Sequence, residues 1–159
     1  MRKRTNQRNR NKGFSLVELI VVIAIMAVLV GVLAPQFIGY VAKSRQATDV
    51  QNAQTLATEI GVKIANAEAE GDTTFKPATT WTEVTTAVVS AVPVVKNSSV
   101  GANAVFCYMV DSEDTVHVAV GIKGADPATP NVDADKGQLF PTFGKDTIGS
   151  GHWYDRIKQ

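Results

Sequence analysis

The chain has 159 residues, 45% of them apolar, which is enough for one domain with a modest hydrophobic core. Its net charge of +1 conceals an uneven distribution, because residues 1–13 carry six bases and no acid. The remainder holds ten bases against all fifteen acids, which argues against a nucleic-acid-binding domain, whose basic patch belongs to the folded part. The single cysteine, Cys107, excludes an intramolecular disulfide, and because it lies in an apolar run we expect it to be a buried core residue.

An uncharged apolar segment follows the basic residues. Every residue of 19–34 is apolar or glycine, and no charge appears through Val41. As a helix, residues 14–41 would be roughly 40 Å long, enough to cross a bilayer core of about 30 Å. Because the bases precede this segment and the acids follow it, the positive-inside rule predicts a cytoplasmic N-terminus and an exported remainder.

Three kinds of segment have this general pattern. A cleaved secretory signal would use Val32-Leu33-Ala34 as its cleavage site, but Pro35 would then follow the cut, which disfavours processing there. A plain signal anchor accounts for the basic flank and the apolar length. It does not account for Glu18, an acid inside the apolar segment.

Glu18 needs a partner, because an acid in a spanning helix costs about 2.5–3.5 kcal/mol at the bilayer centre and somewhat less near its edge. A cut between Gly13 and Phe14 would create a new α-amino group four residues before Glu18, one helical turn away or at the matching level of a neighbouring helix. An amine–carboxylate pair between subunits would set their axial register, since a shifted register leaves both charges in hydrocarbon.

The run Lys12-Gly13-Phe14-Ser15-Leu16-Val17-Glu18, followed by the apolar stretch, closely resembles the class III signal of type IV pilins and type II secretion pseudopilins. The resemblance covers roughly residues 8–42. It implies that a prepilin peptidase cuts after Gly13 and methylates the amine of Phe14, and that Glu18 is the assembly residue.

The resemblance also implies an architecture and a set of partners. We expect a leader over 1–13, a hydrophobic transmembrane and assembly helix over 14–42, and an exported head domain over 43–159. The fold would be the α+β type IV pilin fold, a long helix over about 14–70 with its C-terminal half packed on a small antiparallel sheet. Partners would be further copies of the chain, prepilin peptidase, an assembly ATPase with its inner-membrane platform proteins, and the membrane that holds the precursor.

The helix pattern continues beyond the apolar segment. Apolar residues recur at steps of three and four until about Glu70, where Gly71 predicts the helix end: Val50, Ala53, Ala57, Ile60, Ile64 and Ala67. The first half of the helix contains three helix-weakening residues at four-residue intervals: Gly31, Pro35 and Gly39. Pro35 removes one backbone hydrogen bond. Both a kink and a locally melted helix accommodate that loss, and the resemblance adds that this region often melts in pilus filaments.

The rest of the head reads as a small sheet. Thr80-x-x-Glu83 fits a capping box and predicts a short helix ending before Pro93, although the many β-branched residues leave a strand open. The clearest strands are 104–110 and 115–122, the second with one buried face, joined by an acidic turn. Residues 138–143 form a candidate third strand, which Pro141 assigns to a sheet edge.

No motif in the head predicts catalysis, so we expect a structural protein and no enzyme. Asn131, Asp133 and Asp135 alternate as in a calcium loop, but the loop's glycine and glutamate positions hold other residues, so they are weak metal ligands and we expect no cofactor. His117 and His152 lack the spacing of zinc ligands. The aromatic residues favour core packing over an adhesive surface: Trp81, Trp153 and Tyr154.

Three functions fit these features. The first is the structural subunit of a type IV pilus, a surface filament for adhesion, motility or DNA uptake. The second is a pseudopilin of a type II secretion or competence machine, which the missing disulfide cysteines and the missing pseudopilin tail signature disfavour. The third, from a different class, is a single-pass membrane-anchored binding protein.

Overall fold

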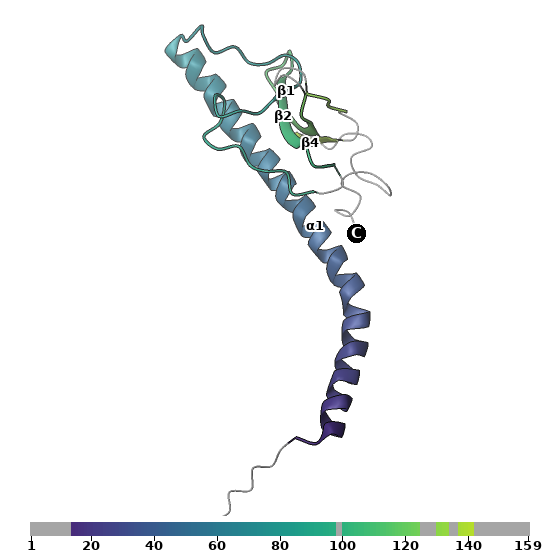
Figure 1. Cartoon of the computed structure of the whole chain (residues 1–159). Helices are drawn as coiled ribbons and strands as arrows, with labels where there is room; N and C mark the ends of the chain where they lie inside the picture. Colours follow the sequence, from purple (N-terminus) through teal and green to yellow (C-terminus); the bar gives the residue numbers. More distant parts are fainter. Residues whose placement is uncertain (1–13, 98–99, 125–129, 134–136, 142–159) are drawn as a thin grey trace, which may run out of the picture. The chain divides into compact units, whose positions relative to one another are not determined.

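The computed structural model describes residues 14–97, 100–124, 130–133 and 137–141. In chain order they form one helix and four short strands: α1 (Leu16–Glu70), β1 (Thr82–Glu83), β2 (Ala104–Val110), β3 (Val116–Ile122) and β4 (Gln138–Phe140) (Figure 1). This confirms the expected α+β fold of one long helix and a small antiparallel sheet. The chain divides into two compact units, one up to Gly39 and one from Tyr40. The predicted leader, 1–13, lies outside the described residues.

The first unit contains the apolar beginning of α1. The helix passes through Gly31, Pro35 and Gly39 without interruption, so the isolated chain keeps the helix there. Melting of this region on assembly stays a prediction. Side chains from Leu16 to Ile38 are exposed on all sides of the helix, and this part of α1 is long and apolar enough to cross a membrane.

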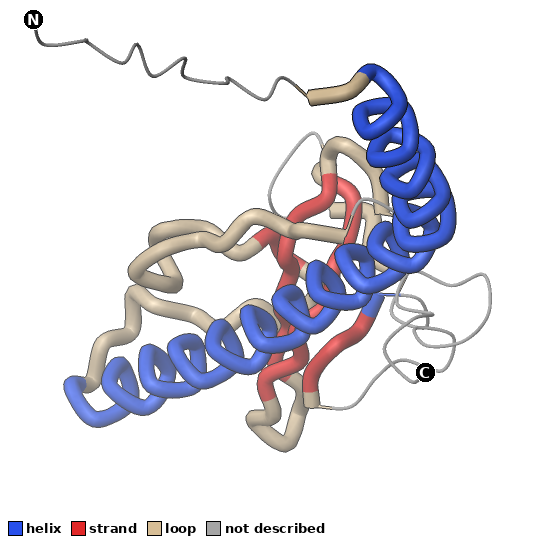
Figure 2. Tube along the Cα trace, turned by 90° about the horizontal axis from the view of Figure 1, so that it is seen from below, coloured by secondary structure: helices blue, strands red, loops and turns tan. Residues whose placement is uncertain are grey.

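In the second unit α1 packs on the sheet, as predicted. Figure 2 shows the strands lying across the later turns of the helix. The stripe at steps of three and four is the buried face, and it shares one core with side chains of all three longer strands: Ala53, Leu56, Ala57, Ile60 and Ile64 with Phe106, Tyr108, Val110, Val116, Val118, Val120 and Leu139. This apolar burial is the main stabilising contribution to the head domain.

The end of α1 follows from one residue. Gly71 has a φ of +68°, the left-handed conformation that side chains with a Cβ disfavour. Its N–H donates to the Glu68 carbonyl at 3.2 Å, and the N–H of Asp72 donates to the Ala67 carbonyl at 2.8 Å. These two bonds are a Schellman motif, which confirms the predicted C-terminus.

The sheet has the order β1-β2-β3-β4, with every pair antiparallel. A tight turn joins β2 to β3, and its first acid organises it: Asp111 Oδ1 accepts the N–H groups of Glu113 and Thr115, each at 2.9 Å. Asp111 Oδ2 lies 2.8 Å from His117 Nε2. This hydrogen bond is the main reason that the pKa of the Asp111 carboxyl is lowered.

Of the two alternatives left open after Thr80, the short helix was wrong and a strand forms instead. Thr82 and Glu83 form β1 instead and pair with β2, and the N–H of Val84 then donates to the Phe106 carbonyl at 2.8 Å. The open edge of β2 offers backbone partners that an isolated helical turn lacks, and β-branched neighbours favour that extended pairing. The strand predicted over 138–143 is β4, which ends at Phe140, and as expected it is an edge strand next to Pro141.

The prediction of a single buried face for β3 was also wrong. Ala119 and Cys107, which point away from α1, are fully buried. Asn131 pairs with Ile122 through two backbone hydrogen bonds of 2.9 Å and brings Val132 over this second face. Burial is therefore the main cause that raises the pKa of the Cys107 thiol, to about 12, and Cys107 is a core residue as expected.

Gly121 is where this covering segment comes closest to the sheet. A Cβ at this position would lie 2.7 Å from Val132 Cγ2 and 2.9 Å from the Asn131 carbonyl oxygen. We predict that Gly121→Ala destabilises the head by about 1–3 kcal/mol, the usual cost of overpacking. The measurement is urea-induced unfolding of the full chain in detergent, followed by tryptophan fluorescence.

Gly61→Ala is the matched control, because a Cβ there meets nothing within 4 Å and Gly61 lies inside α1. This substitution should stabilise the chain by roughly 0.5–1 kcal/mol, since alanine is the better helix former. Equal effects of the two substitutions would show that residues 131–132 do not cover Gly121.

Candidate functional site

The candidate site lies at the start of α1. Phe14 is 93% exposed and not helical, Ser15 precedes the first helical residue, and Glu18 is the third residue of the helix. Gly13, the other half of the predicted cleavage site, lies outside the described residues. The expected helix start at Phe14 is thus shifted by two residues, because Ser15 is the N-cap.

Ser15 and Glu18 form a reciprocal cap. Glu18 Oε2 accepts the backbone N–H of Ser15 at 2.8 Å, and Ser15 Oγ accepts the N–H of Val17 at 3.4 Å. The N–H of Leu19 donates to the Ser15 carbonyl at 3.2 Å, the first bond of the helix. This is a capping box, which satisfies N–H groups that would otherwise have no partner at the helix end.

The cap gives Glu18 a role within its own chain. A carboxylate near a helix N-terminus is favourably placed against the helix dipole, and its hydrogen bond compensates part of the cost of an acid in apolar surroundings. An ionised carboxylate can accept several hydrogen bonds, so the one from Ser15 does not exhaust it. Glu18 can therefore cap α1 and also accept a second donor, such as an amine of another chain.

Sequence reasoning missed Ser15, although a signal was present. Ser15-x-x-Glu18 has the same spacing as Thr80-x-x-Glu83, the pattern that wrongly predicted a helix in the head. The two patterns differ in the segments that come after them. An apolar run of helical length comes after Ser15, whereas the segment after Thr80 is short and β-branched.

The helix after Glu18 presents an apolar surface that the described residues leave uncovered. Large apolar side chains from Leu16 to Tyr40 are between 47% and 73% exposed. Each would gain about 1.5–3 kcal/mol on full burial. In water this surface would be an aggregation hazard, so the segment needs lipid or other protein helices around it.

The structure does not test the three weak metal candidates as a set. Asn131 is engaged through its backbone with Ile122, and the Asp133 carbonyl accepts the N–H of Gly137 at 2.8 Å. Asp135 lies outside the described residues. Within the part of the chain that the structure describes, no three His, Cys, Asp or Glu side chains are grouped to hold a metal ion.

The histidines and the aromatic residues singled out in the sequence are also only partly covered by the described residues. His117 pairs with Asp111 in the turn after β2, while His152, Trp153 and Tyr154 lie outside the described residues. Trp81 is half-buried beside β1, which fits a packing role better than an exposed adhesive one.

Comparison with protein families independently identifies the start of the chain as a known motif. Residues 8–34 match the family model described as the prokaryotic N-terminal methylation motif. The chain is also 41% identical over 49 residues to the type IV major pilin protein PilA of Myxococcus xanthus. That match covers 31% of this chain and 22% of the relative, so the chain is aligned to less than a quarter of the relative's length. No solved structure matches the chain significantly.

The cap itself can be tested. Ser15→Ala removes the hydroxyl that accepts the Val17 N–H and should weaken the first turn by about 0.5–2 kcal/mol. We predict faster amide hydrogen exchange at Val17 in detergent micelles, with exchange at Ile60 unchanged. Ser15→Thr keeps the acceptor and should exchange like the parent chain. If Ser15→Ala also exchanged like the parent, the capping role of the hydroxyl would be wrong.

Proposed function

We propose that this chain, which carries a type IV pilin-like class III signal, is the structural subunit of a type IV pilus. Single copies would wait in the cytoplasmic membrane and polymerise through the N-terminal part of α1 into a surface filament. The observation that supports this most directly is Glu18 at the edge of a fully exposed apolar helix. The similarity of a 49-residue stretch to a major pilin favours the pilus subunit over a pseudopilin.

The apolar surface of α1 is the source of cohesion in this proposal. In the membrane, lipid covers it; in the filament, the same residues would pack against helices of other copies. Since lipid chains are as apolar as these side chains, exchange of one cover for the other has little hydrophobic driving force. Assembly therefore depends on close packing, on the charge pair, and on an external ATPase with its platform proteins, which would extract the subunit.

Glu18 would determine which helices pack at which level. A prepilin peptidase would cut between Gly13 and Phe14 and methylate the new amine of Phe14. Phe14 is exposed and lies outside the helix, so an amine on this residue would be free to reach the carboxylate of another copy. A pair formed at the wrong axial level would leave both charges without partners in an apolar bundle, which costs several kcal/mol.

The charge of the chain is consistent with the direction of export. Six bases before α1 would stay in the cytoplasm, and the head would be outside. The head would then cover the outer surface of the filament. This arrangement requires no reaction by the chain itself, and the proposed role is structural rather than enzymatic.

Two substitutions at Glu18 separate its possible roles. Glu18→Gln keeps an acceptor for the Ser15 N–H but removes the charge, while Glu18→Ala removes both. We predict that both variants lose nearly all surface filaments, counted by electron microscopy, while the precursor remains in the membrane. Glu68→Ala, a change at an exposed acid in the second half of α1, should assemble normally.

Other outcomes would point to other functions. Normal filaments with Glu18→Gln would reduce Glu18 to a helix cap. Cells that carry the parent chain but never a filament would contradict the pilus subunit and favour a membrane-anchored binding protein. Filaments confined to the cell envelope would favour the pseudopilin.

A further inference from the structure

The exposed side of α1 in the head domain carries no charge over more than four turns. Between Arg45 and Lys63 every exposed residue of the helix is uncharged: Ala47, Thr48, Gln51, Gln54, Thr55, Thr58 and Val62. The solvent face of a surface helix normally carries charged residues, and charge is depleted at the centres of protein interfaces. We call these seven residues the neutral face.

The two acids in this interval both accept hydrogen bonds from the backbone of one segment. Asp49 is fully buried, and its oxygens accept the N–H groups of Lys96 and Asn97 at 2.7 and 2.8 Å. Glu59 accepts the N–H of Ser90 at 3.2 Å. The two carboxylates thus hold residues 90–97, which we call the strap, along one flank of the helix.

The hydroxyl groups of the neutral face are already satisfied. Thr48, Thr55 and Thr58 each donate to the carbonyl four residues earlier in α1, at 2.9, 3.1 and 3.0 Å. Burial of a hydroxyl is costly mainly when its donor is left without a partner. Because these three donors have partners within the helix, another protein can cover the three hydroxyl groups at little desolvation cost.

Three of the four exposed large apolar residues described in the head belong to the neutral face or the strap. Between residues 41 and 141, the exposed large apolar side chains among the described residues are Val62, Val92, Val94 and Ile122. Val62 belongs to the neutral face, and Val92 and Val94 belong to the strap. Val94 is 69% exposed and so projects from the strap as an apolar knob.

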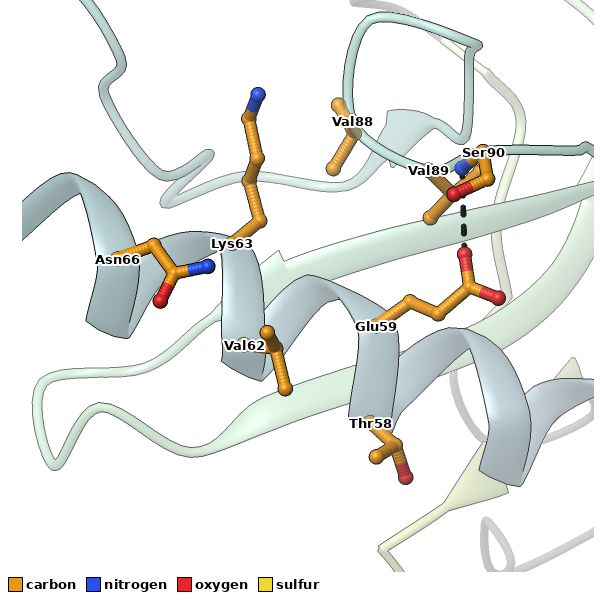
Figure 3. A pocket seen from close by; sticks show the side chains of 8 residues that line it. All are labelled: Thr58, Glu59, Val62, Lys63, Asn66, Val88, Val89 and Ser90. Atoms are coloured by element: carbon orange, nitrogen blue, oxygen red, sulfur yellow. Dashed lines mark hydrogen bonds between the residues drawn. The ribbon is translucent and has the colours of Figure 1, made fainter.

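A hollow lies where the neutral face meets the loop that leads into the strap (Figure 3). Its volume is about 290 Å³, and its lining includes Thr58, Val62, Val88 and Val89. Figure 3 shows Glu59 and Ser90 joined at one end and Lys63 and Asn66 at the other. The surface therefore offers both an apolar projection and an apolar recess.

We propose that the neutral face and the strap together form the surface through which the head contacts the head of a second copy of this chain. This inference rests on the proposed function, because it needs copies brought together in a filament. A projection and a recess at different places on one surface suit a heterologous contact, the kind that repeats as an open helical filament.

The size of the surface favours a second copy over an unrelated partner. From Ala47 to Val62 the face is roughly 24 Å long and about 10 Å wide. An area on the order of 240 Å² is well below the roughly 800 Å² per partner of a stable interface. Such a surface holds a partner only together with other contacts, and the exposed apolar start of the same helix supplies these for another copy. The neutral face has no exposed charged residue and the strap has a single one, Lys96, so the surface lacks the basic patch that a nucleic acid needs.

Cysteine cross-linking on intact cells tests the contact. The native Cys107 is fully buried, so its thiol should not react with the maleimide. The variants Val62→Cys and Val94→Cys each place a thiol on the surface, and Ser112→Cys places one on the exposed turn after β2 as the matched control. A bifunctional maleimide should link the double variant Val62→Cys, Val94→Cys into chains of two or more copies, identified by mass spectrometry.

A second measurement guards against variants that fail for other reasons. In assembled filaments, Val62→Cys should react several-fold more slowly with a monofunctional maleimide than Ser112→Cys, and the two should react alike in detergent-dispersed monomers. Filaments in which Val62→Cys and Ser112→Cys react alike would overturn this inference and leave the pilus subunit standing. Cross-links to a different protein would also overturn this inference, because the surface would then bind that protein and not a second copy. Parent cells without filaments would overturn the proposed function and this inference with it.

Discussion

The apolar surface at the start of α1 is left uncovered by the residues that the structure describes. The residues from Leu16 to Ile38 are exposed around the whole helix, so hydrophobic stabilisation that a globular domain obtains internally must come from lipid or from other chains. The rest of the molecule is organised around this requirement. The second half of α1 has a conventional amphipathic pattern and a closed core, so the head can fold while the anchor remains in a membrane.

Glu18 has to satisfy two demands. In a single chain it must be tolerated at the edge of an apolar helix, and the hydrogen bond from Ser15 helps to meet that demand. In the proposed filament it must also discriminate between correct and shifted neighbours. A carboxylate with one oxygen engaged by its own helix retains capacity for an amine, so the two roles are compatible. Capping also orients the side chain before assembly, which lowers the entropy lost when a pair forms.

In the head, as at Glu18, acidic side chains accept hydrogen bonds from backbone N–H groups. Asp49 and Glu59 turn from solvent to the backbone of residues 90–97, and Asp111 organises the turn between β2 and β3. Each acid holds a segment that has little regular structure of its own. As a result the exposed side of α1 is free of charge from Ala47 to Val62, which makes this stretch suited to contact with another head.

Local patterns were sufficient to predict part of this structure. The α1 stripe, its end at Gly71 and the strands around Cys107 depend on periodicity and on single-residue backbone preferences. Three contacts join residues that are not neighbours in the sequence: the pairing of Thr82 with Tyr108, the cover of Gly121 by Val132, and the hydrogen bond from Asn97 to Asp49. No local pattern encodes such contacts, and the capping pattern at Thr80 was misleading because tertiary pairing overrode it.

At the candidate site, the cost of an acid in an apolar segment drew attention to Glu18, and the family resemblance implied the role of Phe14. The role of Ser15 required the geometry of the helix start. The central claim is that the chain is processed at the junction before Phe14 and assembles through the new terminus. Mass spectrometry of the mature chain, purified from the cell surface, tests it most directly. The account predicts an N-terminal Phe14 carrying a methyl group on its amine. An intact Met1, or a chain that begins after Ala34, would contradict it.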